Sequence, residues 1–152
     1  MIDETTDRTV NEYVTAMVGG ELFGLPIGRV QDVFVPDRVT RVPLAPPEIA
    51  GILNLRGRIV TLVDLCHRLG LEHRDPSVMA IGVELKGESY GLMIDQVGEV
   101  MSLDVADFER NPVNLDRNLA AVTSGIYRLE SQLLLVLDID RVLDIGRGAA
   151  AA

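Results

Sequence analysis

The feature that most constrains this sequence is an internal repeat spaced by about half of the chain. The segment 51–65 returns as the segment 125–139, with a glycine at the start of each copy and an aspartate near its end. An earlier segment, 20–33, returns as 87–100, and half of its fourteen positions are identical. A spacing of this length excludes a solenoid of short units. The repeat predicts that the chain folds as two related subdomains.

Both subdomains, about 12–70 and 78–145, are predicted to consist of short β-strands. Runs rich in Val, Leu and Ile are separated by glycine-containing tight turns, which is the pattern of β-hairpins. The chain has three Tyr, three Phe and no Trp, so its core must be built from branched aliphatic side chains, as in small barrels. The sequence therefore predicts an all-β barrel fold with short helices. The repeated segments should superimpose, with Phe23 and Tyr90 at equivalent sites.

Two short helices are predicted where strands end, at 65–69 and 139–144. Asp64 and Asp138 precede them. An aspartate at such a position accepts hydrogen bonds from the free backbone N–H groups of the first helical turn. Capping therefore explains Asp138 better than membership of a catalytic carboxylate cluster with the two aspartates that follow it.

The remaining segments are predicted to be irregular or to connect the subdomains. The polar stretch 104–119 is rich in Asn and Asp and predicts the longest loop, followed by a strand at 120–129. Residues 71–77 form the linker between the repeats. The ends of the chain, 1–11 and 146–152, are expected to be tails, the first of them disordered.

Charge and composition narrow the function. The net charge of −9 argues against a nucleic-acid partner and against binding to an anionic membrane surface. Cys66 is the only cysteine, so no internal disulfide can form and a reducing compartment is expected. The first residues show no signal-peptide pattern, and no run approaches the ~18 apolar residues of a spanning helix. We therefore expect a soluble, cytoplasmic protein.

The residue patterns of common enzymes and metal sites are missing from the sequence. Cys66, His67 and His73 are the only thiol and imidazoles, and their spacing does not complete a tetrahedral metal site. A buried thiol and two surface histidines are the better interpretation. The phosphate-binding loop, the dinucleotide-binding glycine motif and the nucleophile elbow are also absent. We expect no catalytic activity, no cofactor and no bound metal.

The block 51–65 resembles the signature of the CheW-like family of chemotaxis coupling proteins. The pattern of residues 13–33, the Val-Thr-Arg-Val-Pro run at 39–43 and the closing strand and helix at 133–143 are similar to that family as well. Together the resemblance covers about residues 12–145. The sequence departs from the family at Thr61, where a proline is usual, and 120–125 match only loosely.

The resemblance implies a fold and a function. The fold is two intertwined five-stranded SH3-like barrels that share a hydrophobic seam. The function is that of a non-catalytic adaptor, which couples the cytoplasmic tips of chemoreceptors to the regulatory domain of a CheA-type histidine kinase in membrane-associated receptor arrays. One alternative is a coupling module for a non-chemotactic array of the same type, controlling pili or a second messenger. A small β-barrel enzyme or ligand carrier is the alternative of a different class.

The resemblance also implies a partner-binding surface around the turn Asn-Leu-Arg-Gly. Asp32 and Arg56 are expected to lie close together there, facing the receptor and the kinase. The full set of candidate partner-binding residues is Asp32, Arg56, Asn54, Leu55, Gly57, Val30, Val33, Gly51 and Leu44. Glu130, the counterpart of Arg56 in the second repeat, belongs to a turn that has lost the signature.

Overall fold

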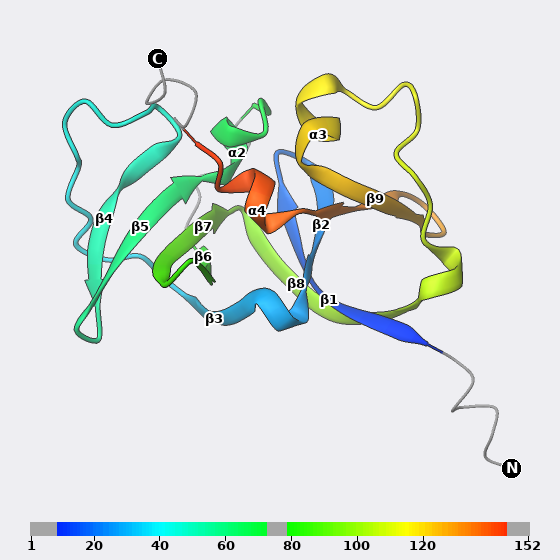
Figure 1. The fold of residues 1–152 in the computed structure, drawn as a ribbon, viewed down its shortest axis with the longest axis horizontal. Coiled ribbons are helices and arrows are strands. Elements are labelled where there is room, and N and C mark those ends of the chain that lie inside the picture. Colours follow the sequence, from blue (N-terminus) through cyan, green and yellow to red (C-terminus); the bar gives the residue numbers. More distant parts are fainter. Residues whose placement is uncertain (1–8, 73–78, 146–152) are drawn as a thin grey trace, which may run out of the picture.

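The computed structural model describes residues 9–72 and 79–145, which form two five-stranded sheets joined in the centre of the molecule (Figure 1). The strands are β1 (Val10–Val18), β2 (Glu21–Pro26), β3 (Val30–Phe34), β4 (Ile49–Leu55), β5 (Arg58–Asp64), β6 (Met79–Leu85), β7 (Glu88–Ile94), β8 (Gln96–Asp104), β9 (Thr123–Arg128) and β10 (Leu133–Leu137). The helical segments are η1 (Ile27–Arg29), α2 (Leu65–Arg68), η2 (Val105–Asp107), α3 (Arg117–Val122) and α4 (Ile139–Val142). The expected tail 146–152, most of the tail 1–11 and most of the linker 71–77 lie outside the described residues.

The two halves of the chain exchange strands. One sheet has the order β8-β1-β2-β10-β9 and the other β3-β6-β7-β5-β4. Each sheet therefore combines the first two strands of one repeat with the last three of the other. We call them barrel A, which contains β1, and barrel B, which contains β3. The predicted fold of two intertwined five-stranded β units is confirmed.

The hairpins that begin the two repeats have the same register. Phe23 on β2 faces Ala16 on β1, and Tyr90 on β7 faces Val83 on β6, seven residues earlier in each case. Both hairpins turn through two residues with positive φ, the second of which is a glycine. Such turns match the right-handed twist of the paired strands. Phe23 and Tyr90 thus occupy equivalent positions, as the repeat predicted.

Each barrel is closed by the chain that follows its edge strand. Beyond β3, Thr40 pairs with Ile52 on β4, and beyond β8, Glu109 pairs with Ile126 on β9. The repeated glycine lies beside each bridge. A Cβ on Gly51 would lie 2.5 Å from the carbonyl oxygen of Thr40. Gly125 is crowded in the same way by Glu109 and Phe108. Close approach of two backbones therefore explains why both copies of the repeated segment, 51–65 and 125–139, begin with glycine.

The largest apolar cluster lies between the barrels and forms the seam that the resemblance implied. It joins Phe23 and Leu25 of barrel A to Ile81 and Leu92 of barrel B, all of them fully buried. The helices α2, α3 and α4 add further apolar side chains to this cluster. Each barrel also has a small cluster of its own: Phe34, Leu53, Val60, Leu62 and Ala80 in barrel B, and Tyr13, Tyr127, Leu134 and Val136 in barrel A.

Polar contacts fix the helices at the seam. The side chain of Asp64 accepts a hydrogen bond from the N–H of His67, and Asp138 accepts one from the N–H of Arg141. The predicted capping role of both aspartates is confirmed. Arg68 on α2 then donates to the carbonyl oxygens of Val142 and Arg141, each at 2.8 Å. Because cations are favourable at helix C-termini, this contact ties α2 to the end of α4.

One local prediction was wrong. The segment predicted as a loop running into a strand at residue 120 contains α3, and β9 begins only at Thr123. Asp116 caps this helix by accepting from the N–H groups of Asn118 and Leu119. Leu119 and Val122, three residues apart, are buried on one side of it. The run 39–43 before the proline-rich connection contributes the single bridge at Thr40.

The packing around the repeated glycine predicts the effect of one methyl group. Gly51→Ala should lower the free energy of unfolding by ~1–3 kcal/mol, because its Cβ would overlap Thr40 and Val39. Gly28→Ala is the matched control, since no atom lies within 4 Å of a Cβ at that position. Urea unfolding of both variants measures the difference. Equal stability of the two variants would contradict this account of barrel closure.

Candidate partner-binding surface

The turn between β4 and β5 is held in place by its own residues. Arg56 and Gly57 have φ angles of 54° and 85°, the left-handed pair that a two-residue hairpin turn needs. The side-chain oxygen of Asn54 accepts a hydrogen bond from the N–H of Gly57 at 2.9 Å. Asn54 and Gly57 therefore fix the shape of the turn. The Arg56 side chain is 76% exposed and extends from it into solvent.

Asp32 and Arg56 come together as expected. A guanidinium nitrogen of Arg56 lies 3.6 Å from a carboxylate oxygen of Asp32 on β3, and the Asp32 side chain is 27% exposed. Asp32 faces Gly82 on β6. Any Cβ at Gly82 would collide with the Asp32 carboxylate, so this glycine leaves room for the acid. Sequence reasoning missed Gly82, because nothing in its local pattern links it to the turn.

An apolar groove of about 600 Å³ lies beside the arginine turn. Its walls are Val35, Asp37, Arg38, Thr40, Ile52, Leu53, Asn54, Leu55 and Ile59. Val35 and Ile59 are 66% and 59% exposed and present apolar surface along the walls of this groove. Neither was predicted as a site residue. The alternation of Val33 and Val35 along an edge of the sheet was the signal that could have identified Val35.

The other predicted residues lie in different environments. Val33 is 39% exposed on β3, whereas Val30 is half-buried against the seam. Leu55 is half-buried against the small core of barrel B, and Gly51 is buried beneath Thr40. Leu44 is fully exposed with a φ of 66°. It belongs to the connection that enters β4 at the end opposite to the arginine turn (Figure 1).

The described residues show no grouping typical of a metal site. Within residues 9–72 and 79–145, no three His, Cys, Asp or Glu side chains gather where they could hold an ion. Cys66 is buried and its thiol donates to the carbonyl oxygen of Leu71. Burial raises the pKa of the Cys66 thiol to about 11, and the charges of Asp95 and Asp64 act in the same direction. His67 is exposed, and His73 lies outside the described residues.

The Arg56–Asp32 ion pair and the neighbouring groove thus lie together on one barrel of a double β-barrel fold. The family model of the CheW-like domain matches residues 12–146, and the chain belongs to this family. In fold and family it is a chemotaxis coupling adaptor. None of the helices in the described part of the chain is long and apolar enough to cross a bilayer.

Relatives from several bacteria agree with this assignment. The chain is similar to the chemotaxis protein CheW of Rhizobium meliloti, with 26% identity over 133 residues and 86% of each chain covered. It is also similar to the protein PilI of Pseudomonas aeruginosa, with 29% identity over 122 residues, covering 78% of this chain and 67% of PilI. The crystal structure of the scaffolding protein TtCheW from Thermoanaerobacter tengcongensis superimposes with a TM-score of 0.76, 31% identity and coverage of 85% and 89%.

The environment of Cys66 predicts an unreactive thiol. Because the thiolate is the reactive form and the pKa is raised to about 11, alkylation by iodoacetamide at pH 8 should be far slower than for an exposed cysteine. Unfolding in urea should restore the ordinary rate, which mass spectrometry can follow. The unfolded thiol titrates near 9.0, so the contribution of Cys66 to stability is fully present below that pH and is lost as pH rises toward 11. Rapid alkylation of the folded protein would contradict the buried placement.

Proposed function

We propose that this protein is a non-catalytic adaptor that couples the cytoplasmic tips of chemoreceptors to the regulatory domain of a CheA-type histidine kinase. In this role it works in the cytoplasm, at membrane-associated receptor arrays. The observation that carries the proposal is the exposed Arg56–Asp32 pair beside the apolar groove, on a domain of the CheW-like family. The candidate residues Asp32, Arg56, Asn54, Leu55, Gly57 and Val33 form or flank this surface.

The chemistry of the surface suits a reversible protein contact. Interfaces of this kind combine an apolar centre with a polar rim. Val35 and Ile59 supply exposed apolar area, and Arg56 and Asp32 supply charge at its edge. Val30 and Gly51 lie outside the exposed part of this surface, because Val30 is half-buried against the seam and Gly51 is buried beside Thr40. Leu44 offers a second apolar contact at the other end of β4.

A coupling role in a non-chemotactic array is the second candidate. The similarity to PilI supports it, because that protein was matched over most of this chain. The two candidates share one surface and differ in the receptors and kinase that they join. Restoring function in deletion strains that lack either type of coupling protein would separate them. Recovery of chemotaxis alone is the expected result.

Reversing the charge at the arginine turn tests the proposed surface. An exposed ion pair contributes only ~0.2–1 kcal/mol to folding, so Arg56→Glu should leave the Tm nearly unchanged. At a partner interface the same change places a like or unmatched charge in a partly desolvated site and weakens binding by ~2–5 kcal/mol. Binding of a receptor tip and of the kinase regulatory domain, measured by calorimetry, should therefore fall strongly.

Two controls make this test specific. Glu130→Lys reverses an exposed charge at the corresponding turn of barrel A and should keep binding, because that turn lacks the signature. The exchange Asp32→Arg with Arg56→Asp rebuilds the internal ion pair with opposite polarity. If Arg56 faces a partner, the exchange should not restore binding. Full recovery, equal losses at both turns, or a large drop in Tm for Arg56→Glu would each count against the assignment.

The non-catalytic role predicts a negative result in a direct assay. The purified protein should show no turnover and no micromolar binding of ATP or zinc in calorimetry, because its sequence lacks the phosphate-binding and metal-ligand patterns that such sites need. A receptor tip added to the same cell serves as the positive control. A saturable micromolar signal with ATP or zinc would reopen the enzyme interpretation.

A further inference from the structure

The connection that enters β4 contains one residue whose backbone conformation is costly for its type. The N–H of Ala45 donates to the carbonyl oxygen of Val42 at 3.3 Å, which closes a β-turn with Pro43 and Leu44 at its centre. The φ of Leu44 is 66°, the left-handed range that the second central residue of a type II turn requires. Glycine or asparagine is favoured at this position, because a bulky side chain crowds the backbone there. The turn alone would therefore be served better by a residue other than leucine.

The side chain of Leu44 also contributes nothing to the described core. It is 104% exposed, so the fold hides none of its apolar area. Val39 and Val42 on the same connection are 41% and 40% exposed, so the connection presents further apolar surface. A leucine in a strained and fully exposed place has two costs that the fold does not repay. Backbone strain of this kind indicates a function outside the chain's own packing.

The turn is held in a fixed shape on both sides. Pro43 fixes φ at the first central position. The N–H of Ile49 donates to the carbonyl oxygen of Pro46 at 2.9 Å, and Thr40 is bound to Ile52 through two backbone hydrogen bonds of 2.8 Å. A side chain that is held in place before binding loses little conformational freedom on binding. The leucine is therefore placed as a rigid apolar anchor.

A positive charge accompanies this anchor. Arg41 is the charged residue nearest to Leu44 in the chain, and it is exposed. Among the described residues it forms no ion pair. Asp37 and Glu48 lie farther away along the chain, one on each side. The guanidinium of Arg41 is thus free to meet a carboxylate of a partner beside the leucine.

We propose that Leu44 is an anchor for the regulatory domain of the kinase, inserted into an apolar pocket of that domain with a carboxylate at its rim. The inference rests on the proposed adaptor function. A protruding side chain needs a concave partner, which a globular regulatory domain can present, whereas the convex tip of a receptor suits the groove beside the arginine turn. The two features lie at opposite ends of β4, so one barrel can meet both partners (Figure 1).

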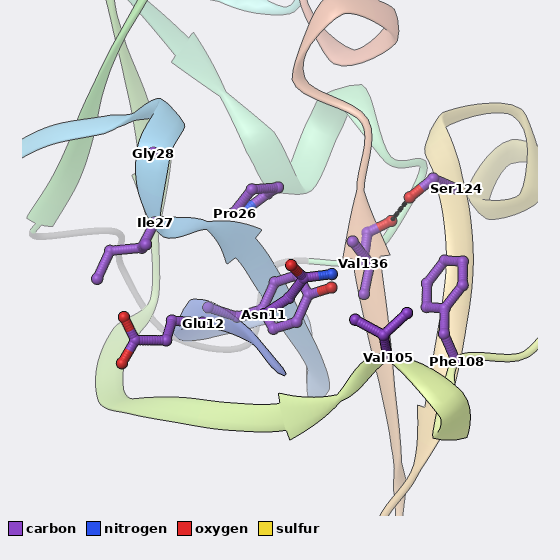
Figure 2. A pocket seen from close by; sticks show the side chains of 10 residues that line it. Asn11, Glu12, Pro26, Ile27, Gly28, Val105, Phe108, Ser124 and Val136 are labelled. Atoms are coloured by element: carbon purple, nitrogen blue, oxygen red, sulfur yellow. Dashed lines mark hydrogen bonds between the residues drawn. The ribbon is translucent and has the colours of Figure 1, made fainter. Parts of the chain in front are cut away.

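A second copy of this chain is the competing occupant. Its barrel A carries an apolar pocket of about 360 Å³, with Ile27 on one side and Val105 and Phe108 on the other (Figure 2). Two copies that each carry a net charge of −9 repel one another, which disfavours this pairing. Sedimentation velocity should therefore find the protein alone to be monomeric. A dimer that Leu44→Asn dissociates would overturn the assignment to the kinase.

The test replaces the leucine by asparagine and measures stability and binding separately. Asparagine is close to leucine in size and tolerates a positive φ, so Leu44→Asn should keep the Tm or raise it by about 1–3 °C. In calorimetry the kinase regulatory domain should bind this variant roughly tenfold more weakly, as expected for a central anchor. Binding of a receptor tip should be unchanged. Arg41→Glu should weaken the kinase domain as well and leave the receptor tip unaffected.

Barrel A supplies matched controls. The bridges at Thr40 and Glu109 are equivalent, so Val113 holds in barrel A the place of Leu44 in barrel B. Val113 is 105% exposed and also follows a proline, but its φ is not positive. Val113→Asn should therefore leave binding of the kinase domain unchanged. Arg110→Glu is the corresponding control for the charge.

The outcomes separate this inference from the adaptor function itself. Unchanged binding of the kinase domain to Leu44→Asn would overturn the anchor and leave the adaptor function in place. Weaker binding of the receptor tip instead, or an equal loss for Val113→Asn, would overturn it as well. A fall in Tm for Leu44→Asn would show that the leucine serves the fold. If the unmodified protein bound neither partner, the adaptor function would fail and this inference with it.

Discussion

The hydrophobic seam between the barrels is the interaction on which the rest of the structure depends. Because each sheet takes two strands from one half of the chain and three from the other, neither half can complete a sheet alone. Burial of Phe23 and Ile81 in one shared cluster therefore couples the two barrels. The many contacts between distant segments also place this chain among topologies that fold slowly. A variant that loosens the seam should affect both barrels together.

On this shared framework the two repeats have diverged in chemistry. In barrel B the β4–β5 hairpin has a two-residue turn that presents Arg56, whereas in barrel A the β9–β10 connection is longer and is closed by a bond from the N–H of Leu129 to Gln132. In the interior it is barrel A that carries the larger polar side chain. Tyr13 of barrel A stands at the register position of Ala80 in barrel B. Each barrel therefore offers one feature that the other lacks.

Local signals in the sequence were sufficient for the elements that local physics determines. The hairpins and the capping by Asp64 and Asp138 follow from turn and cap chemistry that acts within a few residues. The helix α3 was missed although Asp116 carries the same capping signal, because the Asn- and Asp-rich surroundings predicted a loop. The proximity of Asp32 and Arg56 followed from the family resemblance and not from any spacing in the chain.

Features assembled from distant strands could not be predicted in this way. The exchange of strands between the halves depends on which edges pair, and both pairings satisfy the same alternation of apolar residues. The room that Gly82 leaves for Asp32 appears only when β3 and β6 are neighbours. The pocket lined by Tyr13 and Phe108 in barrel A likewise draws on separate segments of both repeats.

The separation of the charged turn from the seam has a physical consequence for an adaptor. Charges in the seam would have to be desolvated and would weaken the contact that holds the molecule together. The ion pair proposed here for partner binding lies instead at the periphery, where Arg56 contributes little to folding. A change of charge at this turn can therefore alter the surface of barrel B without loosening the seam.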